Sequence, residues 1–233
     1  MTLMVLGSES KGNCYLLESD SGVLIIEAGI RLSEVKKALN YDLSRVVGCL
    51  VTHQHGDHFK YAGDYAKAGI NIYASAETLA KSETIKHRGI KIESERPFTV
   101  ARHTVVPFNV AHNVPTLGFL IKHPEMGKLL FVTDSAFINN KFNGLNHVCI
   151  EANYDDPLLM NDRAIGKHMS IDTCMDFLRF TDMSQVRNIV LLHLSSGNSN
   201  ASDFTSKVKK ISRFATVHVA DRGLKINLNL NPF

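Results

Sequence analysis

The sequence is short of the features that would mark a secreted, membrane-bound or disulfide-stapled protein. Its four cysteines, Cys14, Cys49, Cys149 and Cys174, lie far apart and form no C-x-x-C pair, which excludes a zinc ribbon and a disulfide scaffold. No apolar stretch approaches a membrane span, and the N-terminus lacks the basic, apolar and small-residue segments of a secretion signal. We therefore expect a protein of the reducing cytoplasm without a membrane partner.

Neither sign of charge dominates the chain. The formal net charge is +3 at pH 7, which tolerates an anionic substrate but does not by itself define a nucleic-acid-binding protein. The basic stretch at 81–102 also carries glutamates, as a solvated surface does. Hydrophobic residues make up 44% of the chain, enough for a full core, and no repeat or linker divides it. We expect one domain over residues 1-233.

Strand-like and helix-like patterns both occur, and strands predominate. Short apolar runs predict strands at 3–6, 14–18, 23–26, 46–51, 70–73, 98–101, 104–110, 117–122, 129–133, 148–151, 189–192 and 216–219. Helical spacing predicts helices at 33–39, 61–68, 76–85, 170–180 and 202–213. This order indicates a mixed α/β class (α+β), with strands in two blocks and helices packed outside.

A dense cluster of metal-binding side chains follows the predicted strand at 46–51. His53, His55, Asp57 and His58 place three imidazoles and a carboxylate within six residues, on a strand-to-helix loop. These nitrogen and oxygen donors suit zinc, manganese or iron. Alternation puts His53 and His55 on one side, and Gly56 lets the chain turn, so that one loop can serve two metals. The alternative is a histidine-rich surface loop without function.

Three further donors each follow an apolar run, and this favours the metal site. His112, Asp134 and His193 come after the runs at 105–110, 129–132 and 189–192, whose ends we expect at one rim of a sheet. Seven donors are enough for two cations with a position left open, as a catalytic site requires. Two neighbouring cations would lower the pKa of a bridging water and neutralise charge on an oxyanion or phosphoryl group.

These seven positions resemble the ligand signature of the metallo-β-lactamase superfamily, H-x-H-x-D-H followed by separate His, Asp and His ligands. The resemblance implies a four-layer αβ/βα sandwich and two divalent metal ions, zinc before manganese. It also implies the ligand assignment: one ion held by His53, His55 and His112, the other by Asp57, His58 and His193, and Asp134 as the bridge between them.

Within that superfamily the chain resembles the YycJ/WalJ group of metal-dependent exonucleases, which are related to RNase Z. The likeness covers nearly the whole chain and is carried by segments 7–14, 24–29, 51–58, 151–155 and 193–198. It implies a binuclear phosphodiesterase that acts on nucleic acid or nucleotides, and it allows a homodimer. His168 resembles the histidine that phosphodiesterase members place near the leaving group, the alternative being a loop or N-cap histidine. We predict Asp57 and His168 as catalytic residues.

The sequence departs from the family pattern at two places. Glu27 stands where the family usually has Asp, so that the carboxylate which steadies the ligand loop is expected to be displaced by a methylene. The connection from Asp155 to His168 is shorter than expected, and Lys167 separates Gly166 from His168.

Substrate contacts and the other histidines complete the prediction. The resemblance points to substrate contacts at Ser8, Asn13, His168, Ser195 and Asn198, although turn chemistry explains Ser8 and Asn13 equally well. His218 is expected to be a packed or surface residue of a strand. Four histidines without companion donors are expected at the surface: His87, His103, His123 and His147.

Other functions remain open at this stage. Small phage phosphodiesterases that degrade cyclic nucleotides in anti-Pycsar defence resemble this general type. The fold also permits hydrolysis of a thioester, lactone or β-lactam, which needs no counterpart of His168. A binding module with a purely structural metal is a third alternative, and the complete set of seven donors argues against it.

Overall fold

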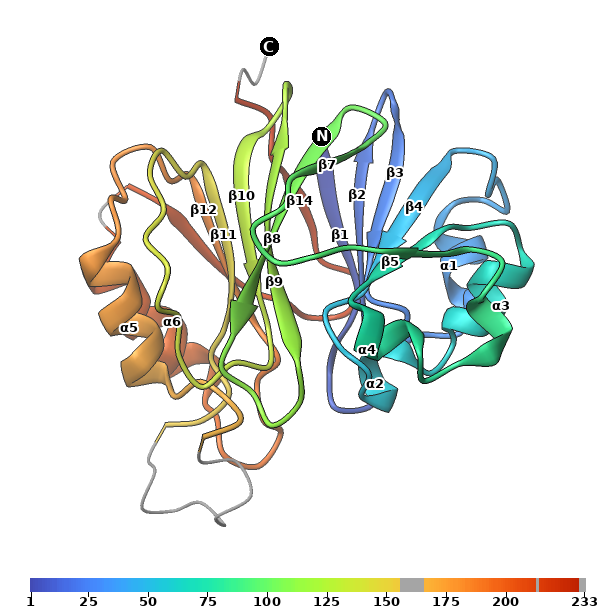
Figure 1. The fold of residues 1–233 in the computed structure, drawn as a ribbon. Helices are drawn as coiled ribbons and strands as arrows, with labels where there is room; N and C mark the ends of the chain where they lie inside the picture. Colours follow the sequence, from blue (N-terminus) through green and yellow to red (C-terminus); the bar gives the residue numbers. More distant parts are fainter. Residues whose placement is uncertain (156–165, 213, 231–233) are drawn as a thin grey trace.

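The computed structural model describes residues 1–155, 166–212 and 214–230. Two seven-stranded sheets pack face to face, and helices cover the outer face of each sheet (Figure 1). The layers follow one another as helices, sheet, sheet, helices, which confirms the predicted four-layer sandwich. Most of the connection between Asp155 and His168, predicted to be short, lies outside the described residues.

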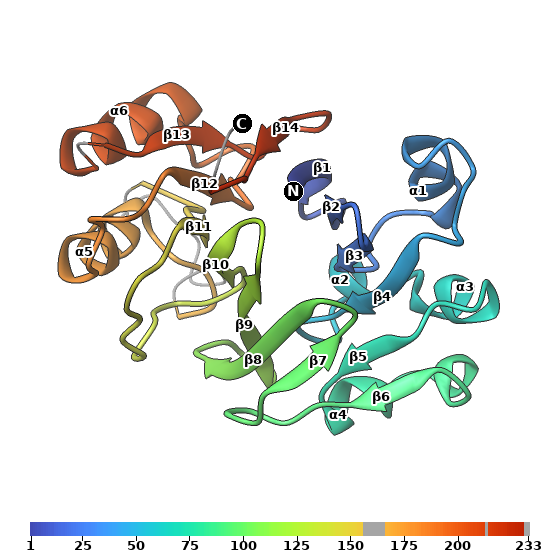
Figure 2. The same cartoon turned by 90° about the horizontal axis from the view of Figure 1, so that it is seen from above.

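The first half of the chain and the last strand build the first sheet. Its strand order is β14-β1-β2-β3-β4-β5-β6, and α1 and α3 lie on its outer face (Figure 2). The strands are β1 (Thr2–Glu9), β2 (Gly12–Ser19), β3 (Gly22–Ile26), β4 (Val46–Leu50), β5 (Ile72–Ala74), β6 (Gly89–Lys91) and β14 (Lys225–Asn227). The helices are α1 (Leu32–Ala38), α2 (Gly56–Phe59), α3 (Ala62–Lys67), α4 (Ala76–Leu79) and the 3-10 helix η1 (Glu83–Ile85).

The second half builds the second sheet, in the order β13-β12-β11-β10-β9-β8-β7. Its strands are β7 (Phe98–Val100), β8 (His103–Val110), β9 (Thr116–His123), β10 (Gly127–Val132), β11 (His147–Glu151), β12 (Asn188–Leu192) and β13 (Thr216–Val219). Its outer face is covered by α5 (Ile171–Phe180) and α6 (Ala201–Ile211). In the part of the chain described, no helix is both long and apolar enough to cross a membrane.

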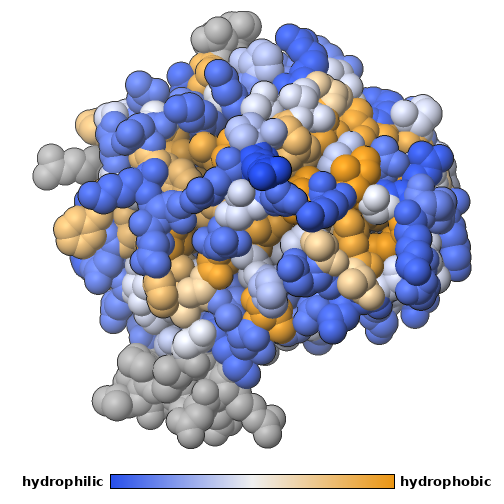
Figure 3. Space-filling view, in the orientation of Figure 1, coloured by the Kyte–Doolittle hydropathy of each residue, from blue (hydrophilic) through white to orange (hydrophobic). Residues whose placement is uncertain are grey.

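Three apolar layers hold these elements together. Successive side chains of a strand point to opposite faces of its sheet, so Leu24 and Ile26 pack between the sheets while Val23 and Ile25 pack under α1 and α3. The second sheet divides its side chains in the same way between the central layer and α5 and α6. Hydrophilic side chains prevail on the face shown in Figure 3, with hydrophobic ones between them toward its middle.

The strand directions bring the predicted donors to one edge. β3 and β4 are parallel, as are β10, β11 and β12, and β8 runs with them because two antiparallel pairings separate it from β10. The carboxyl ends of parallel strands meet at the same edge of a sheet. The residues that follow β4, β8, β10 and β12 therefore converge, as the sequence predicted.

The single helix predicted over 76–85 is wrong, since α4 ends at Leu79 and η1 begins only at Glu83. Between them Ser82 has an extended backbone (φ −143°, ψ 116°). This break turns the chain so that Ile85 is buried in the layer beneath the first sheet, where a continuous helix would carry it past that layer.

The prediction that His103, His123 and His147 lie at the surface is also wrong, whereas His87 is exposed as predicted. The three buried rings lie at strand ends, where other segments cover them, and His103 Nε2 has no hydrogen-bond partner among the described residues. His147 Nε2 lies 2.9 Å from Leu228 O, and the His103 and His123 rings pack with centroids 4.6 Å apart. Burial lowers the pKa of His103 to about 4, and the neighbouring His123 acts in the same direction.

We expect His103 to make the free energy of unfolding dependent on pH. The pKa of this residue is about 4 when folded and about 6.5 in an unfolded chain. Its contribution is complete above pH 6.5 and is lost as the pH falls toward 4, because the unfolded state then binds more protons. When the pH is lowered from 7.5 to 5.0, the free energy of unfolding should therefore fall by about 2 kcal/mol less in His103→Gln than in the parent chain. Urea unfolding measures both values.

The comparison is internally controlled for the histidines that do not contact His103, since their titration is common to both proteins and cancels in the difference. His87→Gln, at an exposed position, should keep the pH dependence of the parent chain. Equal losses in His103→Gln and in the parent would contradict the prediction.

Candidate metal centre

All seven predicted donors meet at the shared edge of the two sheets, in two overlapping sets. In each set, one potential ligand atom per residue lies within 4.8 Å of the others. The first set is His53, His55, His112 and Asp134, and the second is Asp57, His58, Asp134 and His193. The two groups are those that the family resemblance implied, and Asp134 belongs to both.

A single carboxylate oxygen of Asp134 connects the two sets. Its Oδ2 lies 3.5 Å from His53 Nε2 and 3.8 Å from His112 Nε2, both in the first set. The same oxygen lies 3.4 Å from His58 Nε2, in the second set. Asp134 is thus placed as a bridging ligand would be.

The spacing of the donors fits divalent cations. Ligands about 2.05 Å from a tetrahedral zinc lie about 3.4 Å from one another. His112 Nε2 lies 3.3 Å from His55 Nδ1, and His193 Nε2 lies 3.4 Å from Asp57 Oδ2. Both distances are close to the spacing expected around a zinc ion. Both are also slightly longer than the usual range of a hydrogen bond, about 2.7–3.2 Å.

Buried nitrogens without partners give a second test of the fit. His53 Nε2 and His193 Nε2 are buried and make no hydrogen bond within the described structure, although each faces the donors of its set. A buried polar atom without a partner costs about 1–3 kcal/mol. A cation coordinated by each set would satisfy the nitrogen in that set, so the residues present fit divalent metal ions.

Electrostatics divide the histidines into two kinds. Burial lowers the pKa of His53 well below 6.5, and burial likewise lowers the pKa of His112, so both rings are neutral and keep a lone pair for a metal. Burial also opposes the charged form of His193, but Asp134, Asp57 and Glu151 outweigh it and raise the pKa to about 10. Carboxylates therefore concentrate on the side of the second set.

The backbone adopts uncommon conformations where it delivers these side chains. Glu27, Asp134 and His193 have φ values of 71°, 50° and 53°, which are rare for residues other than glycine. Each follows a strand, β3, β10 or β12, at the edge where the donors meet. Such strain persists only where the surrounding structure imposes it, and it concentrates at functional sites.

Close backbone packing holds α2 against the loop after β3. A Cβ on Gly29 would lie only 1.6 Å from Asp57 O, so no other residue fits there. Ala28 N–H donates to His58 O at 2.7 Å. Main-chain contacts thereby fix the positions of Asp57 and His58. The sequence had predicted only that these two residues lie on a strand-to-helix loop.

Glu27 reaches the site despite its additional methylene. It is fully buried, its Oε1 lies 3.3 Å from His58 Nδ1, and its Oε2 lies 3.4 Å from the Thr52 N–H that donates to it. The expected displacement of this carboxylate therefore does not separate it from the ligand loop. On the other side, Thr52 Oγ1 lies 2.9 Å from His53 Nδ1 and orients that ring.

Glu151 is a site residue that the prediction missed. It is fully buried at the end of β11, and its Oε1 lies 2.7 Å from His168 Nδ1 and 3.2 Å from His193 Nδ1. Its Oε2 accepts main-chain N–H bonds from Ser135 and Met169, at 2.8 and 3.2 Å. The signal was present, because Glu151 follows an apolar run at the same edge just as Asp134 does.

We expect Glu151→Gln to lower kcat by roughly 10- to 100-fold, as loss of a residue that orients metal ligands typically does. An amide cannot accept from two rings and two main-chain N–H groups as a carboxylate does, so a buried donor loses its partner. Steady-state kinetics and metal analysis of the purified variant measure the effect. Glu83→Gln, at an exposed position, is the matched control; unchanged kcat and metal content in Glu151→Gln would contradict this role.

His168 lies beside the donor sets. Its ring stacks on that of His193 with centroids 5.3 Å apart and lies 5.8 Å from the ring of His112. Burial lowers the pKa of His168, but the hydrogen bond and charge of Glu151 outweigh it and raise that pKa above 6.5. With Nδ1 held by Glu151, Nε2 is the nitrogen left for a substrate.

Two of the predicted substrate contacts, Asn13 and Ser8, are hydrogen-bonded to donor residues. Asn13 Nδ2 donates to Asp57 Oδ2 at 3.1 Å. Ser8 Oγ accepts the His193 N–H at 3.0 Å. Ser195 is half-buried and Asn198 is exposed on the loop after β12. A substrate role for these four residues stays a prediction.

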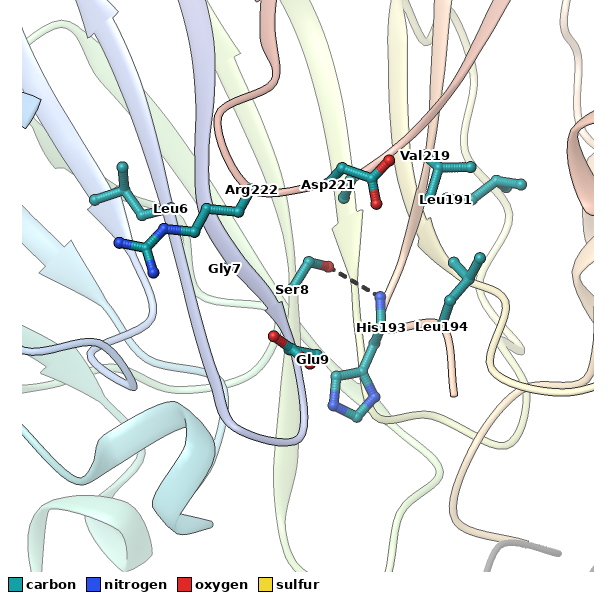
Figure 4. A pocket seen from close by; sticks show the side chains of 11 residues that line it. Leu6, Gly7, Ser8, Glu9, Leu191, His193, Leu194, Val219, Asp221 and Arg222 are labelled. Carbon is teal, nitrogen blue, oxygen red and sulfur yellow. Dashed lines mark hydrogen bonds between the residues drawn. The ribbon is translucent and has the colours of Figure 1, made fainter. Parts of the chain in front are cut away.

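A pocket of about 240 Å³ lies behind the His193 main chain, between the β1–β2 hairpin and the ends of β12 and β13 (Figure 4). Ser8, Asp221 and Arg222 line it, together with leucine side chains. Figure 4 shows the His193 ring pointing away from Asp221, and His193 itself is one of the residues that line the pocket.

Two facing mixed sheets with a histidine and aspartate cluster at their shared edge define a metallo-β-lactamase fold. A model of the Metallo-beta-lactamase superfamily matches residues 7–160, and the chain belongs to this superfamily.

Relatives extend the likeness over most of the chain. It is 27% identical to an exodeoxyribonuclease YycJ of Bacillus anthracis over 221 residues, 84% of this chain and 83% of that one. It is 24% identical to an exodeoxyribonuclease WalJ of Streptococcus pneumoniae, over 84% of this chain and 82% of that one. The predicted resemblance to the YycJ/WalJ group is confirmed.

Solved structures share the fold at lower identity. The metallo-β-lactamase fold protein YhfI of Bacillus subtilis superimposes with a TM-score of 0.79 and 16% identity, over 97% of this chain and 99% of that one. The short form of human tRNase Z gives a TM-score of 0.69 and 16% identity, over 99% and 100% of the chains.

Proposed function

We propose that this chain is a metal-dependent phosphodiesterase that hydrolyses nucleic acid or nucleotides, with an exonuclease as the leading form. The observation that carries the proposal is His168, held by the buried Glu151 beside two donor sets that share Asp134. Relatives named exodeoxyribonucleases support the same substrate class.

The donor chemistry sets out what each residue would do. His53, His55 and His112 would hold one cation, Asp57, His58 and His193 the other, and Asp134 both. Bound divalent cations supply Lewis acidity, which lowers the pKa of water and offsets charge on phosphoryl oxygens. We propose zinc as the first candidate and manganese as the second, because imidazole and carboxylate donors suit both.

His168 would complete the reaction on the leaving-group side. Glu151 accepts from Nδ1 and so fixes the ring with Nε2 toward the centre, where it can give a proton to the departing oxygen. Asn13 and Thr52 orient Asp57 and His53, and thereby keep the donors in place.

The test is a substrate panel with the full chain. Purified protein, analysed for zinc and manganese, is incubated with single-stranded DNA, RNA, cyclic nucleotides, a thioester and a lactone. We expect cleavage of phosphodiesters that a chelator abolishes and added Zn²⁺ or Mn²⁺ restores. Cleavage of cyclic nucleotides alone would favour the cyclic-nucleotide alternative. Turnover of the thioester or lactone without phosphodiester cleavage would replace the proposal.

The cellular setting is part of the proposal. All four cysteines are buried and free, which suits a reducing cytoplasm. A homodimer and a single domain over the whole chain stay predictions.

A further inference from the structure

Two exposed cations lie over the same aromatic ring, in the segments that follow β3 and α2. The Arg31 guanidinium carbon lies 5.7 Å from the centroid of the Tyr61 ring, and Lys60 Nζ lies 5.6 Å from it. We call Arg31, Lys60 and Tyr61 the Tyr61 strip. Both cations are exposed, and the tyrosine is half-buried.

The charge of the strip is not neutralised within the described structure. Neither Arg31 nor Lys60 has a carboxylate within ion-pairing distance among residues 1–155, 166–212 and 214–230. Glu34, on the first turn after Arg31, is bound instead by Lys37 and Arg222, at 3.1 and 2.7 Å. The two cations therefore remain available to an anionic partner.

Main-chain hydrogen bonds fix the strip against the donor-bearing segment. Tyr61 N–H donates to Ala28 O at 3.0 Å, and Ala28 N–H donates to His58 O. Tyr65 Oη donates to Ile30 O at 2.9 Å, which anchors the residue before Arg31. These bonds connect the strip to the segment around α2, and α2 lies at the lower end of the first sheet in Figure 1.

Lys60 lies one helical turn from a predicted ligand. Its N–H donates to Gly56 O at 3.0 Å, and its φ and ψ of −49° and −38° continue α2. Residues three apart on a helix share a face, so Lys60 lies on the face of Asp57, within about one pitch of 5.4 Å. The strip therefore adjoins the short helix that carries Asp57 and His58.

An aromatic ring with two cations close to it matches the way proteins hold a single strand of nucleic acid. Cations follow the phosphates, and an aromatic ring stacks on a base of any sequence. A cyclic mononucleotide has a single phosphate. That phosphate would lie at the donor sets, so nothing would remain to contact the strip. A strand would place its neighbouring phosphates and bases there.

We propose that the Tyr61 strip binds single-stranded polynucleotide next to the scissile bond, so that the substrate is a strand and not a mononucleotide. This inference rests on the proposed function for its placement of the scissile bond. According to this inference, residues outside the donor sets determine the preference for a long substrate and the dependence of substrate binding on salt concentration.

The experiment measures strand binding by the metal-loaded full chain. The probe is a fluorescein-labelled 16-mer phosphorothioate oligothymidylate, which keeps its charge and resists cleavage, and its Kd is measured by anisotropy from 50 to 200 mM salt. Each phosphate contact on a single strand contributes about 0.7 to the slope of log K against log salt. Arg31→Gln/Lys60→Gln should therefore lower the slope by about 1.4 and weaken binding about tenfold at low salt.

Lys209→Gln/Lys210→Gln removes the same charge from exposed positions of α6 and is the matched control. It should leave the slope and Kd nearly unchanged. Equal weakening in both double variants would overturn the proposal in favour of diffuse surface charge. An unchanged Kd and slope in Arg31→Gln/Lys60→Gln would overturn it as well.

Two further arms separate this proposal from the proposed function. A 16-mer oligouridylate distinguishes RNA from DNA as the strand that binds more tightly. Hydrolysis of bis(p-nitrophenyl) phosphate by the unaltered chain tests phosphodiesterase chemistry without any flanking phosphate. Hydrolysis without strand binding would overturn the strip alone, whereas strand binding that depends on Arg31 and Lys60 without any hydrolysis would support the strip and overturn the proposed function.

Discussion

Asp134→Asn is expected to reduce phosphodiester hydrolysis by about 1,000-fold or more, because residues that only support a ligand already contribute roughly 10- to 100-fold. The Oδ2 atom of Asp134 serves both donor sets, at 3.5 Å from His53 Nε2 and 3.4 Å from His58 Nε2. An amide is a weaker ligand and carries no charge to offset two cations. Metal analysis should show that the purified variant contains less metal than the parent chain.

The choice of asparagine separates chemistry from backbone strain. Asp134 has a φ of 50°, and asparagine tolerates this left-handed conformation better than alanine. A metal-free sample should therefore keep its fold, as its circular dichroism spectrum would show, while activity is lost. Asp20→Asn, on the exposed turn before β3, is the control. Full metal content and full activity in Asp134→Asn would rule out the bridging role.

His168→Ala is expected to lower kcat about 100-fold or more on a dinucleotide, within the range of general acid catalysis. The leaving alkoxide of a nucleotide needs a proton, which His168 Nε2 can supply while Glu151 holds Nδ1 at 2.7 Å. The p-nitrophenolate group leaves without one, so hydrolysis of bis(p-nitrophenyl) phosphate should fall far less. The ratio of the two losses identifies the role.

A purely structural histidine would lower both rates by the same factor. His87→Ala, which removes an exposed histidine, is the control for the substitution itself. Undiminished turnover of the dinucleotide by His168→Ala would argue against the general-acid role. Undiminished turnover of a thioester would instead favour the hydrolase alternative that needs no leaving-group histidine.

Local patterns predicted most of the strands correctly because these sheets are buried on both faces. Runs such as those at 23–26, 129–132 and 189–192 are continuously apolar, and β3, β10 and β12 lie there. Short elements were less predictable. The strands β6 and β14 have three residues each, and α2 has four, too few for a period to emerge.

The buried histidines mark the limit of local inference. His103, His123 and His147 have no distinctive neighbours in the sequence, yet residues far along the chain cover them. His147 packs near Leu228 and Asn188, and His123 lies 3.3 Å from Ser21 Oγ. Glu151 was missed for a related reason, since its partners His168 and His193 lie 17 and 42 residues away.

The sequence by itself predicted the seven donors, and it determined their position after apolar strands and the mixed two-block architecture, because these follow from residue type and short-range periodicity. Only the tertiary structure decided which donors share an oxygen, that Glu151 connects His168 to His193, and that Arg31 and Lys60 meet over Tyr61. These relations depend on strand register and on the packing of segments tens of residues apart. No local pattern encodes them, because the sequence around each residue would be the same if its partner lay in another part of the fold.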